Sequence, residues 1–246
     1  MARIYTILFG LCIASFIGSL SYRVPRGISI VRPRSFCPHC FHTLGLADLI
    51  PVVSYLLLRG RCRHCNMKIP PRYFLVELAL PLLFLLLFQR IGFTYRFFLL
   101  SYLISVMLYL SLLDIDTGHV SAWDIAAVYI GSLVLLFFSL TNRVPYRATY
   151  YLFGSLVGVG LVGVSFTVVL LLKRRIPMGA GDLLVIPALG FYFGAREIVR
   201  VLIFGSALGV AVGVVLMAVG AVKRDQKFPL LPYLLAGVAI ELLLFS

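Results

Sequence analysis

Eight long apolar stretches occupy more than half of this 246-residue chain, and they limit the kind of fold it can adopt. They cover residues 4–22, 74–90, 97–113, 121–140, 150–172, 183–195, 201–222 and 228–245. A helix that crosses the hydrocarbon core of a bilayer needs about 20 apolar residues. Because 61% of the residues are hydrophobic and only 13% are charged, a soluble domain of this length is excluded. The sequence therefore predicts an all-α polytopic membrane protein with about eight transmembrane helices.

The basic residues are unevenly distributed between the loops that join these stretches. Fifteen of the 22 Lys and Arg residues lie in the segments 23–73, 173–181 and 223–227, and the other seven lie on the opposite side. Because basic loops stay on the cytoplasmic side, we expect these three segments to be cytoplasmic and both termini to lie outside. Topology accounts for the formal net charge of +13, so the charge predicts no nucleic-acid partner.

Two CxxC pairs lie in the longest of these loops. They are "CPHC" (Cys37 and Cys40) and "CRHC" (Cys62 and Cys65), and 21 residues separate them. Two such turns supply the four thiolates of a tetrahedral zinc site. The cytoplasm is reducing and disfavours disulfides, and four protein thiolates leave no open position for catalysis. We therefore predict a structural zinc ion, with two redox-active CxxC pairs or unliganded thiols as the alternatives.

The apolar stretches and the cysteine loop divide the chain into three parts. We expect a first transmembrane helix (1–22), a cytoplasmic zinc-binding loop domain (23–73) and a transmembrane domain (74–246). The loop domain is too small to build a core of its own. Metal binding is therefore expected to hold it together.

Acidic residues from two distant parts of the chain are expected at the same membrane depth. Asp114 and Asp116, in "LLDIDTGH", end the third apolar stretch, and Asp182, in "GAGD" after Gly179 and Gly181, begins the sixth. Two close carboxylates share a proton, so one can activate water while the other protonates a peptide carbonyl. Glycines allow a substrate strand or a helix to approach closely. This pattern favours an aspartic protease, although "GAG" is also typical of small-residue helix packing.

Motifs along almost the whole chain resemble those of the bacterial type IV prepilin peptidases, a GxGD-type aspartic protease family. They are "PRSFCPHC", "SYLLLRGRCRHC", "IPPRYFLVEL", "LLDIDTG", "GAGD" and "KFPLLPYLLAG". The resemblance implies a multi-pass endopeptidase of the bacterial inner membrane. Such enzymes remove the basic leader from prepilins or pseudopilins at the cytoplasmic face. Many members also N-methylate the new N-terminus with S-adenosylmethionine.

The same resemblance assigns roles to particular residues and partners. It makes Asp114 and Asp182 the catalytic pair, with Asp116, Gly179 and Gly181 in support. It implies prepilin or pseudopilin substrates, the machinery of a type IV pilus or of type II secretion, and membrane lipid as partners.

Three positions depart from the family pattern and keep other functions open. The chain has Ser121-Ala122 where the family has Pro-Asp, Leu184 where a lysine is common, and Gly18 where an asparagine is common. These departures suit a non-catalytic membrane protein of pilus or secretion assembly. A proton-coupled transporter could use the same membrane acids as a relay. The retained pair of aspartates favours the peptidase.

Overall fold

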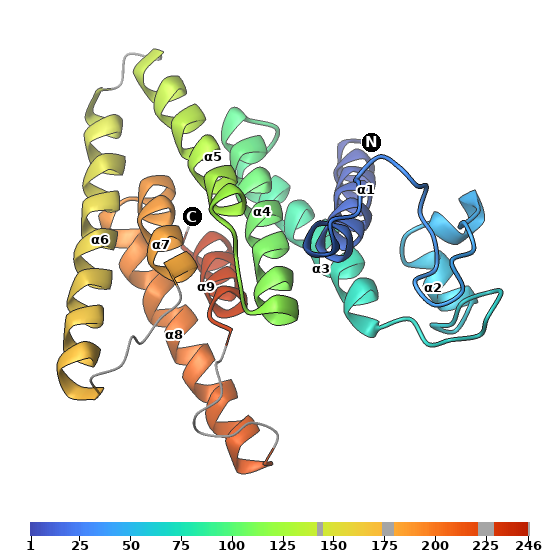
Figure 1. Ribbon diagram of the computed structural model, residues 1–246. Helices are drawn as coiled ribbons and strands as arrows, with labels where there is room; N and C mark the ends of the chain where they lie inside the picture. Colours follow the sequence, from blue (N-terminus) through green and yellow to red (C-terminus); the bar gives the residue numbers. More distant parts are fainter. Residues whose placement is uncertain (142–144, 174–179, 221–228, 246) are drawn as a thin grey trace. The chain divides into compact units, whose positions relative to one another are not determined.

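The computed structural model describes residues 1–141, 145–173, 180–220 and 229–245, and all regular structure within these ranges is helical (Figure 1). Two isolated β-bridges, Phe36 with Thr43 and Arg61 with Lys68, are the only strand-like pairings in the described part of the chain. The chain forms two compact units, Met1–Ser101 and Tyr102–Ser246. This agrees with the expected all-α class.

The first unit contains two long helices and the loop between them. Helix α1 (Ala2–Arg23) packs against α3 (Pro71–Ile91), and Phe9 of α1 stacks on Phe84 of α3 with ring centroids 5.7 Å apart. The connecting loop holds the 3-10 turns η1 (Val24–Arg26) and η2 (Leu46–Leu49) and the short helix α2 (Val53–Leu57). Helix α4 (Tyr95–Thr117) begins in this unit and continues into the second.

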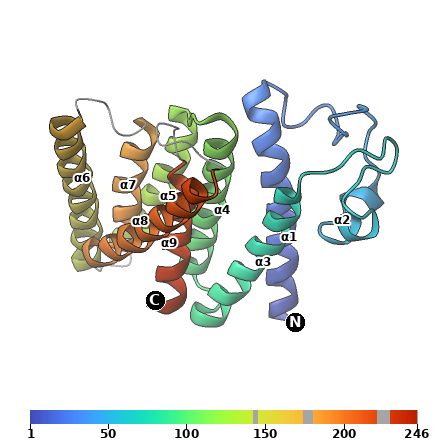
Figure 2. The ribbon, with the colours of Figure 1, turned by 90° about the horizontal axis from the view of Figure 1, so that it is seen from below.

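The second unit is a bundle in which successive helices run in alternating directions (Figures 1 and 2). After α4 come α5 (Ala122–Thr141), α6 (Pro145–Lys173), α7 (Ala180–Phe193), α8 (Ala195–Ala218) and α9 (Leu231–Leu244). Because α5 and α6 lie between them in the chain, the C-terminus of α4 and the N-terminus of α7 lie at the same end of the bundle. This is the arrangement that the two aspartate motifs require.

In the described residues, every apolar stretch of the sequence overlaps a helix of the structure. Among the residues that the structure describes, four helices are long and apolar enough to cross a membrane: Ala2–Arg26, Pro71–Ile91, Tyr95–Thr117 and Ala195–Ala218. The other apolar helical segments are shorter, and they are Ala122–Phe138, Thr149–Val164, Leu184–Phe193 and Leu231–Leu244. The expected membrane protein is thus supported by four candidate spans.

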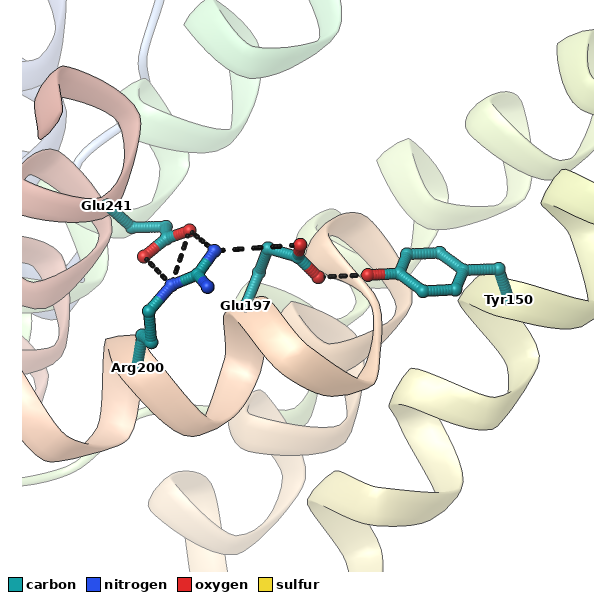
Figure 3. A network of polar contacts seen from close by, with 4 residues as sticks. All are labelled: Tyr150, Glu197, Arg200 and Glu241. Carbon is teal, nitrogen blue, oxygen red and sulfur yellow. Dashed lines mark hydrogen bonds and ion pairs between the residues drawn. The ribbon is translucent and has the colours of Figure 1, made fainter. Parts of the chain in front are cut away.

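A polar network joins three helices of the second unit (Figure 3). On α8, the Arg200 guanidinium forms a forked ion pair with Glu241 of α9, with Nη2 at 2.6 Å from Oε1 and Nε at 2.9 Å from Oε2. Arg200 also lies 3.6 Å from Glu197, whose carboxylate accepts a hydrogen bond from Tyr150 of α6. Only 1% of the Glu241 side chain is exposed, so its charge depends on this pairing.

Removing Arg200 should therefore destabilise the bundle. We expect Arg200→Ala to lower the free energy of unfolding, because the substitution leaves the buried Glu241 carboxylate without its cationic partner. Arg196→Ala, on an exposed position of the same helix, is the matched control and should change little. Unfolding in mixed detergent micelles measures both variants. Equal stability of the two would contradict the structural role of the network.

Candidate functional site

The four cysteines come together on two turns of similar shape. The Cys37 N–H donates to the His42 carbonyl at 3.0 Å, and the Cys62 N–H donates to the Met67 carbonyl at 2.9 Å. All four sulfur atoms lie within 4.8 Å of one another, and the Cys37 and Cys65 sulfurs are 3.8 Å apart. A tetrahedral zinc ion with Zn–S bonds of about 2.3 Å separates its thiolates by about 3.8 Å. The cysteine cluster therefore fits a metal ion, as the sequence predicted.

Local electrostatics favour the thiolate form of Cys62, whereas burial and the neighbouring sulfur atoms raise the pKa of Cys65 to about 11. Backbone N–H groups of Cys65 and His64 donate to the Cys62 sulfur and lower its pKa to about 7. Nearby, Arg63 Nε donates to Asp48 Oδ1 at 2.8 Å, which holds the pKa of the Asp48 carboxyl below its usual value. The thiolate form of Cys62 can bind a cation, and the ion pair of Arg63 with Asp48 holds η2 against the second CxxC turn.

A buried arginine ties the start of the loop to the end of α1. The Arg23 Nη1 atom donates to the carbonyls of Ser29, Ile30 and Pro33 at 2.8, 3.3 and 3.0 Å. Its guanidinium also lies 5.6 Å from the centroid of the Phe36 ring, next to the first cysteine. In the sequence, Arg23 is one of the fifteen basic residues that indicate the topology, and nothing local in the sequence indicates these carbonyl partners.

Asp114 lies at the end of α4 and contacts the start of α9. Its Oδ2 atom accepts a hydrogen bond from the backbone N–H of Leu231 at 3.3 Å, and the side chain is half-buried. Leu231 is the first residue of α9, so the partial positive charge of that helix terminus faces the carboxylate. The closing segment "KFPLLPYLLAG" thus has a contact with the first aspartate that its sequence alone did not reveal.

The second aspartate motif is described in part. Gly181 and Asp182 belong to the first turn of α7, but the Asp182 side chain and Gly179 lie outside the described residues. The helix itself is held from two sides. Tyr129 of α5 donates to the Leu184 carbonyl at 2.8 Å, and Gly190 of α7 meets Gly154 of α6 backbone to backbone, where an added Cβ would clash.

Two other acids near Asp114 have distinct surroundings. Asp116 is exposed on the last turn of α4. Asp124 forms a capping box at the start of α5, accepting the Ser121 N–H and hydroxyl at 3.0 and 2.6 Å. Its other oxygen accepts the Tyr109 hydroxyl of α4 at 2.9 Å. Ser121-Ala122, which stands where the family has Pro-Asp, therefore begins a capped helix, and the sequence alone did not predict this cap.

A cavity of about 260 Å³ lies within the first unit, between α1, α3 and the cysteine loop. Its lining includes the aromatic side chains Tyr22, Tyr73 and Phe74 and the carboxylate Glu77. Glu77 Oε2 accepts the Val52 N–H at 2.7 Å, so the carboxylate joins α3 to the start of α2. The cavity therefore offers aromatic faces and one carboxylate to a ligand.

Comparisons with known proteins give consistent matches over most of the chain. Residues 8–91 match the bacterial peptidase A24 N-terminal domain, and residues 101–214 match the type IV leader peptidase family. Three relatives are named "prepilin leader peptidase/N-methyltransferase". The Myxococcus xanthus protein is 34% identical over 87% of this chain and 63% of its own length. The Bacillus subtilis protein is 30% identical over 94% of this chain and 89% of its own length. The Burkholderia pseudomallei protein is 32% identical over 89% of this chain and 70% of its own length. No solved structure matches the chain.

The cysteine cluster makes a direct prediction about metal content. We expect about one zinc ion per chain, and Cys37→Ser combined with Cys62→Ser should remove it and destabilise the loop. Cys12→Ser is the control, because Cys12 lies on α1 outside the cluster. Elemental analysis of gently purified protein measures the zinc. Wild-type protein without zinc would contradict the assignment.

Proposed function

Because the chain belongs to the type IV leader peptidase family, we propose that it is a membrane-embedded aspartic endopeptidase that removes the leader from prepilins or pseudopilins. Support comes from Asp114, which lies within the family-matched region and is held at the N-terminus of α9. The start of α7, with Asp182, lies at the same end of the bundle. On this proposal the enzyme serves a type IV pilus or a type II secretion system.

The proposed chemistry needs both carboxyl groups, one ionised and one protonated. The ionised carboxylate takes a proton from water as the water oxygen attacks the scissile carbonyl carbon. The protonated carboxyl donates its proton to the carbonyl oxygen. Collapse of the resulting tetrahedral intermediate breaks the C–N bond: the carboxyl that took the water proton passes it to the leaving amine, and the other carboxylate takes a proton back from a hydroxyl of the intermediate. The Leu231 N–H keeps the Asp114 carboxylate oriented during these steps, and Asp116, Gly179 and Gly181 support the pair.

The proposed topology places this chemistry at the cytoplasmic face of the bacterial inner membrane. In this topology the four longer and the four shorter apolar helices all cross the bilayer, the loop domain 23–73 is cytoplasmic, and 74–246 is the transmembrane peptidase domain. The apolar segment of a prepilin lies in the bilayer while its basic leader stays in the cytoplasm. The scissile bond then lies at the interface, next to the ends of α4 and α7.

We also propose N-methylation of the new N-terminus, an activity named for the three relatives. S-adenosylmethionine would bind in the cavity of the first unit and would supply the methyl group. The faces of Tyr22 and Tyr73 and the carboxylate of Glu77 suit its sulfonium cation. The cluster of Cys37, Cys40, Cys62 and Cys65 would hold a structural zinc ion beside this cavity.

The catalytic assignment is tested by single substitutions. Asp114→Asn and Asp182→Asn should each lower leader cleavage by about 10³-fold or more, because an amide can neither accept nor share the proton. Asp116→Asn is the matched control and should cost much less. The assay is co-expression with a candidate prepilin and mass determination of its N-terminus, which reports methylation as well. If Asp182→Asn still cleaved at nearly the wild-type rate, the non-catalytic or transporter function would become the better assignment.

The topology has its own test. Reporter fusions within residues 23–73 should report a cytoplasmic location, and fusions at residues 141–149 and at both termini should report the outside, because fifteen of 22 Lys and Arg fall on one side. A protease added from the outside gives an independent measurement, because it should cleave only the segments that face outward. A loop domain found outside the cytoplasmic membrane would overturn both this topology and the reducing environment assumed for the zinc site.

A further inference from the structure

Five aliphatic side chains of the cysteine loop point outward along η2 and α2. They are Leu46, Ile50, Val53, Leu56 and Leu57, here called the α2 face, and all are exposed in the first unit. Leu49, Tyr55 and Leu58, from the same segment, instead line the cavity toward α1 and α3. The segment is therefore apolar on the side that faces away from the protein. A loop in water would carry polar residues there.

The contacts of α2 place it beside the apolar part of α3. Val52, its N-cap, donates its N–H to Glu77 at 2.7 Å. Glu77 is the seventh residue of α3, about 9 Å along the helix from its start, and it lies within the apolar stretch 74–90. Tyr55 of α2 stacks on Phe74 with ring centroids 4.9 Å apart. Helix α2 thus lies at the level of the membrane-spanning sequence of α3, past its cytoplasmic end.

The contacts of α2 with α1 indicate the same membrane depth for α2. The cavity that α2 lines is also lined by Ala14 and Gly18 of α1. These residues precede the end of α1 at Arg23 by about 14 and 8 Å, at 1.5 Å per residue. Figure 2 shows the loop leaving the end of α1 and running back alongside it to α2. The contacts with α1 and those with α3 therefore both place the α2 face near the boundary between headgroups and acyl chains.

The charge of the loop is complementary to a bacterial membrane surface. Residues 23–73 contain nine Lys and Arg and a single acid, Asp48, which is paired with Arg63. Arg59 and Arg61 follow α2 directly and are exposed. Anionic headgroups attract basic residues that lie close to the surface, by about 1 kcal/mol each.

From this geometry we propose that α2 is an interfacial membrane anchor. The α2 face inserts into the headgroup and acyl boundary of the leaflet that α1 and α3 enter, and Arg59 and Arg61 lie among anionic headgroups. The cysteine loop is thereby attached to the bilayer surface along its outer side, in addition to its two covalent connections. The occupant of the α2 face is lipid, and this holds whether or not the chain cleaves prepilins.

Tryptophan depth measurements test the anchor in the full-length protein. The chain has a single tryptophan, Trp123, so Leu57→Trp in a Trp123→Phe background gives one probe on the α2 face. Val31→Trp in the same background is the matched control. Val31 is 80% exposed and Leu57 is 78% exposed, but Val31 lies in the loop after α1 and outside the α2 face. Both variants go into phosphatidylethanolamine and phosphatidylglycerol vesicles with lipids brominated near the headgroup. Zinc content checks that each is folded, and Leu56→Trp is a second probe.

The outcomes separate lipid from other occupants. We expect brominated lipid to quench the probe at position 57 about twofold more than the probe at position 31, and iodide to show the reverse order. Strong iodide quenching at 57 without lipid quenching would mean that the α2 face lies in water. Protection from both quenchers would mean that protein covers it, either a second copy or the remainder of the chain. Either result overturns the proposal.

Discussion

A carboxylate within a bundle of apolar helices needs hydrogen-bond donors, and Asp114 obtains one from the first N–H of α9. The position of α9 therefore decides how this aspartate is oriented. Two contacts fix α9 against α8: the forked pair of Arg200 with Glu241, and a close approach at Gly237, where an added Cβ would clash with the Val201 carbonyl. Residues far from Asp114 in the sequence thus hold its surroundings in place.

The cysteine loop has about 50 residues and no hydrophobic core of its own, so other contacts must stabilise its shape. Three kinds of contact replace a core. The sulfur cluster closes the two CxxC turns on each other, Arg23 binds three carbonyls at the start of the loop, and Glu77 holds the start of α2. An anchored α2 would add the bilayer surface as a fourth. The sulfur cluster holds the loop together internally, and the other contacts attach the loop to α1, α3 or the membrane.

The sequence predicted features whose signal is local or carried by motifs. Apolar runs predicted each long helix, and two CxxC pairs at a suitable spacing predicted the cluster of Cys37, Cys40, Cys62 and Cys65. It did not predict contacts between distant residues. Leu231 is 117 positions from Asp114, and Glu241 is 41 positions from Arg200. Such pairs depend on how helices pack, and a single sequence holds no periodic signal for them. The pairing of Asp114 with Asp182 stays a prediction for the same reason.

The central claim is that Asp114 and Asp182 meet at one end of the bundle, and oxidative cross-linking tests it most directly. Asp114→Cys and Asp182→Cys are combined in a zinc-loaded chain with Cys12→Ser. A disulfide needs Cβ atoms about 3.5–4.5 Å apart. We predict a linked peptide after mild oxidation, found by mass spectrometry. The pair of Asp116→Cys with Asp182→Cys should link far less, because position 116 faces another side of α4. Equal or stronger linking through position 116, or none through 114, would contradict the account.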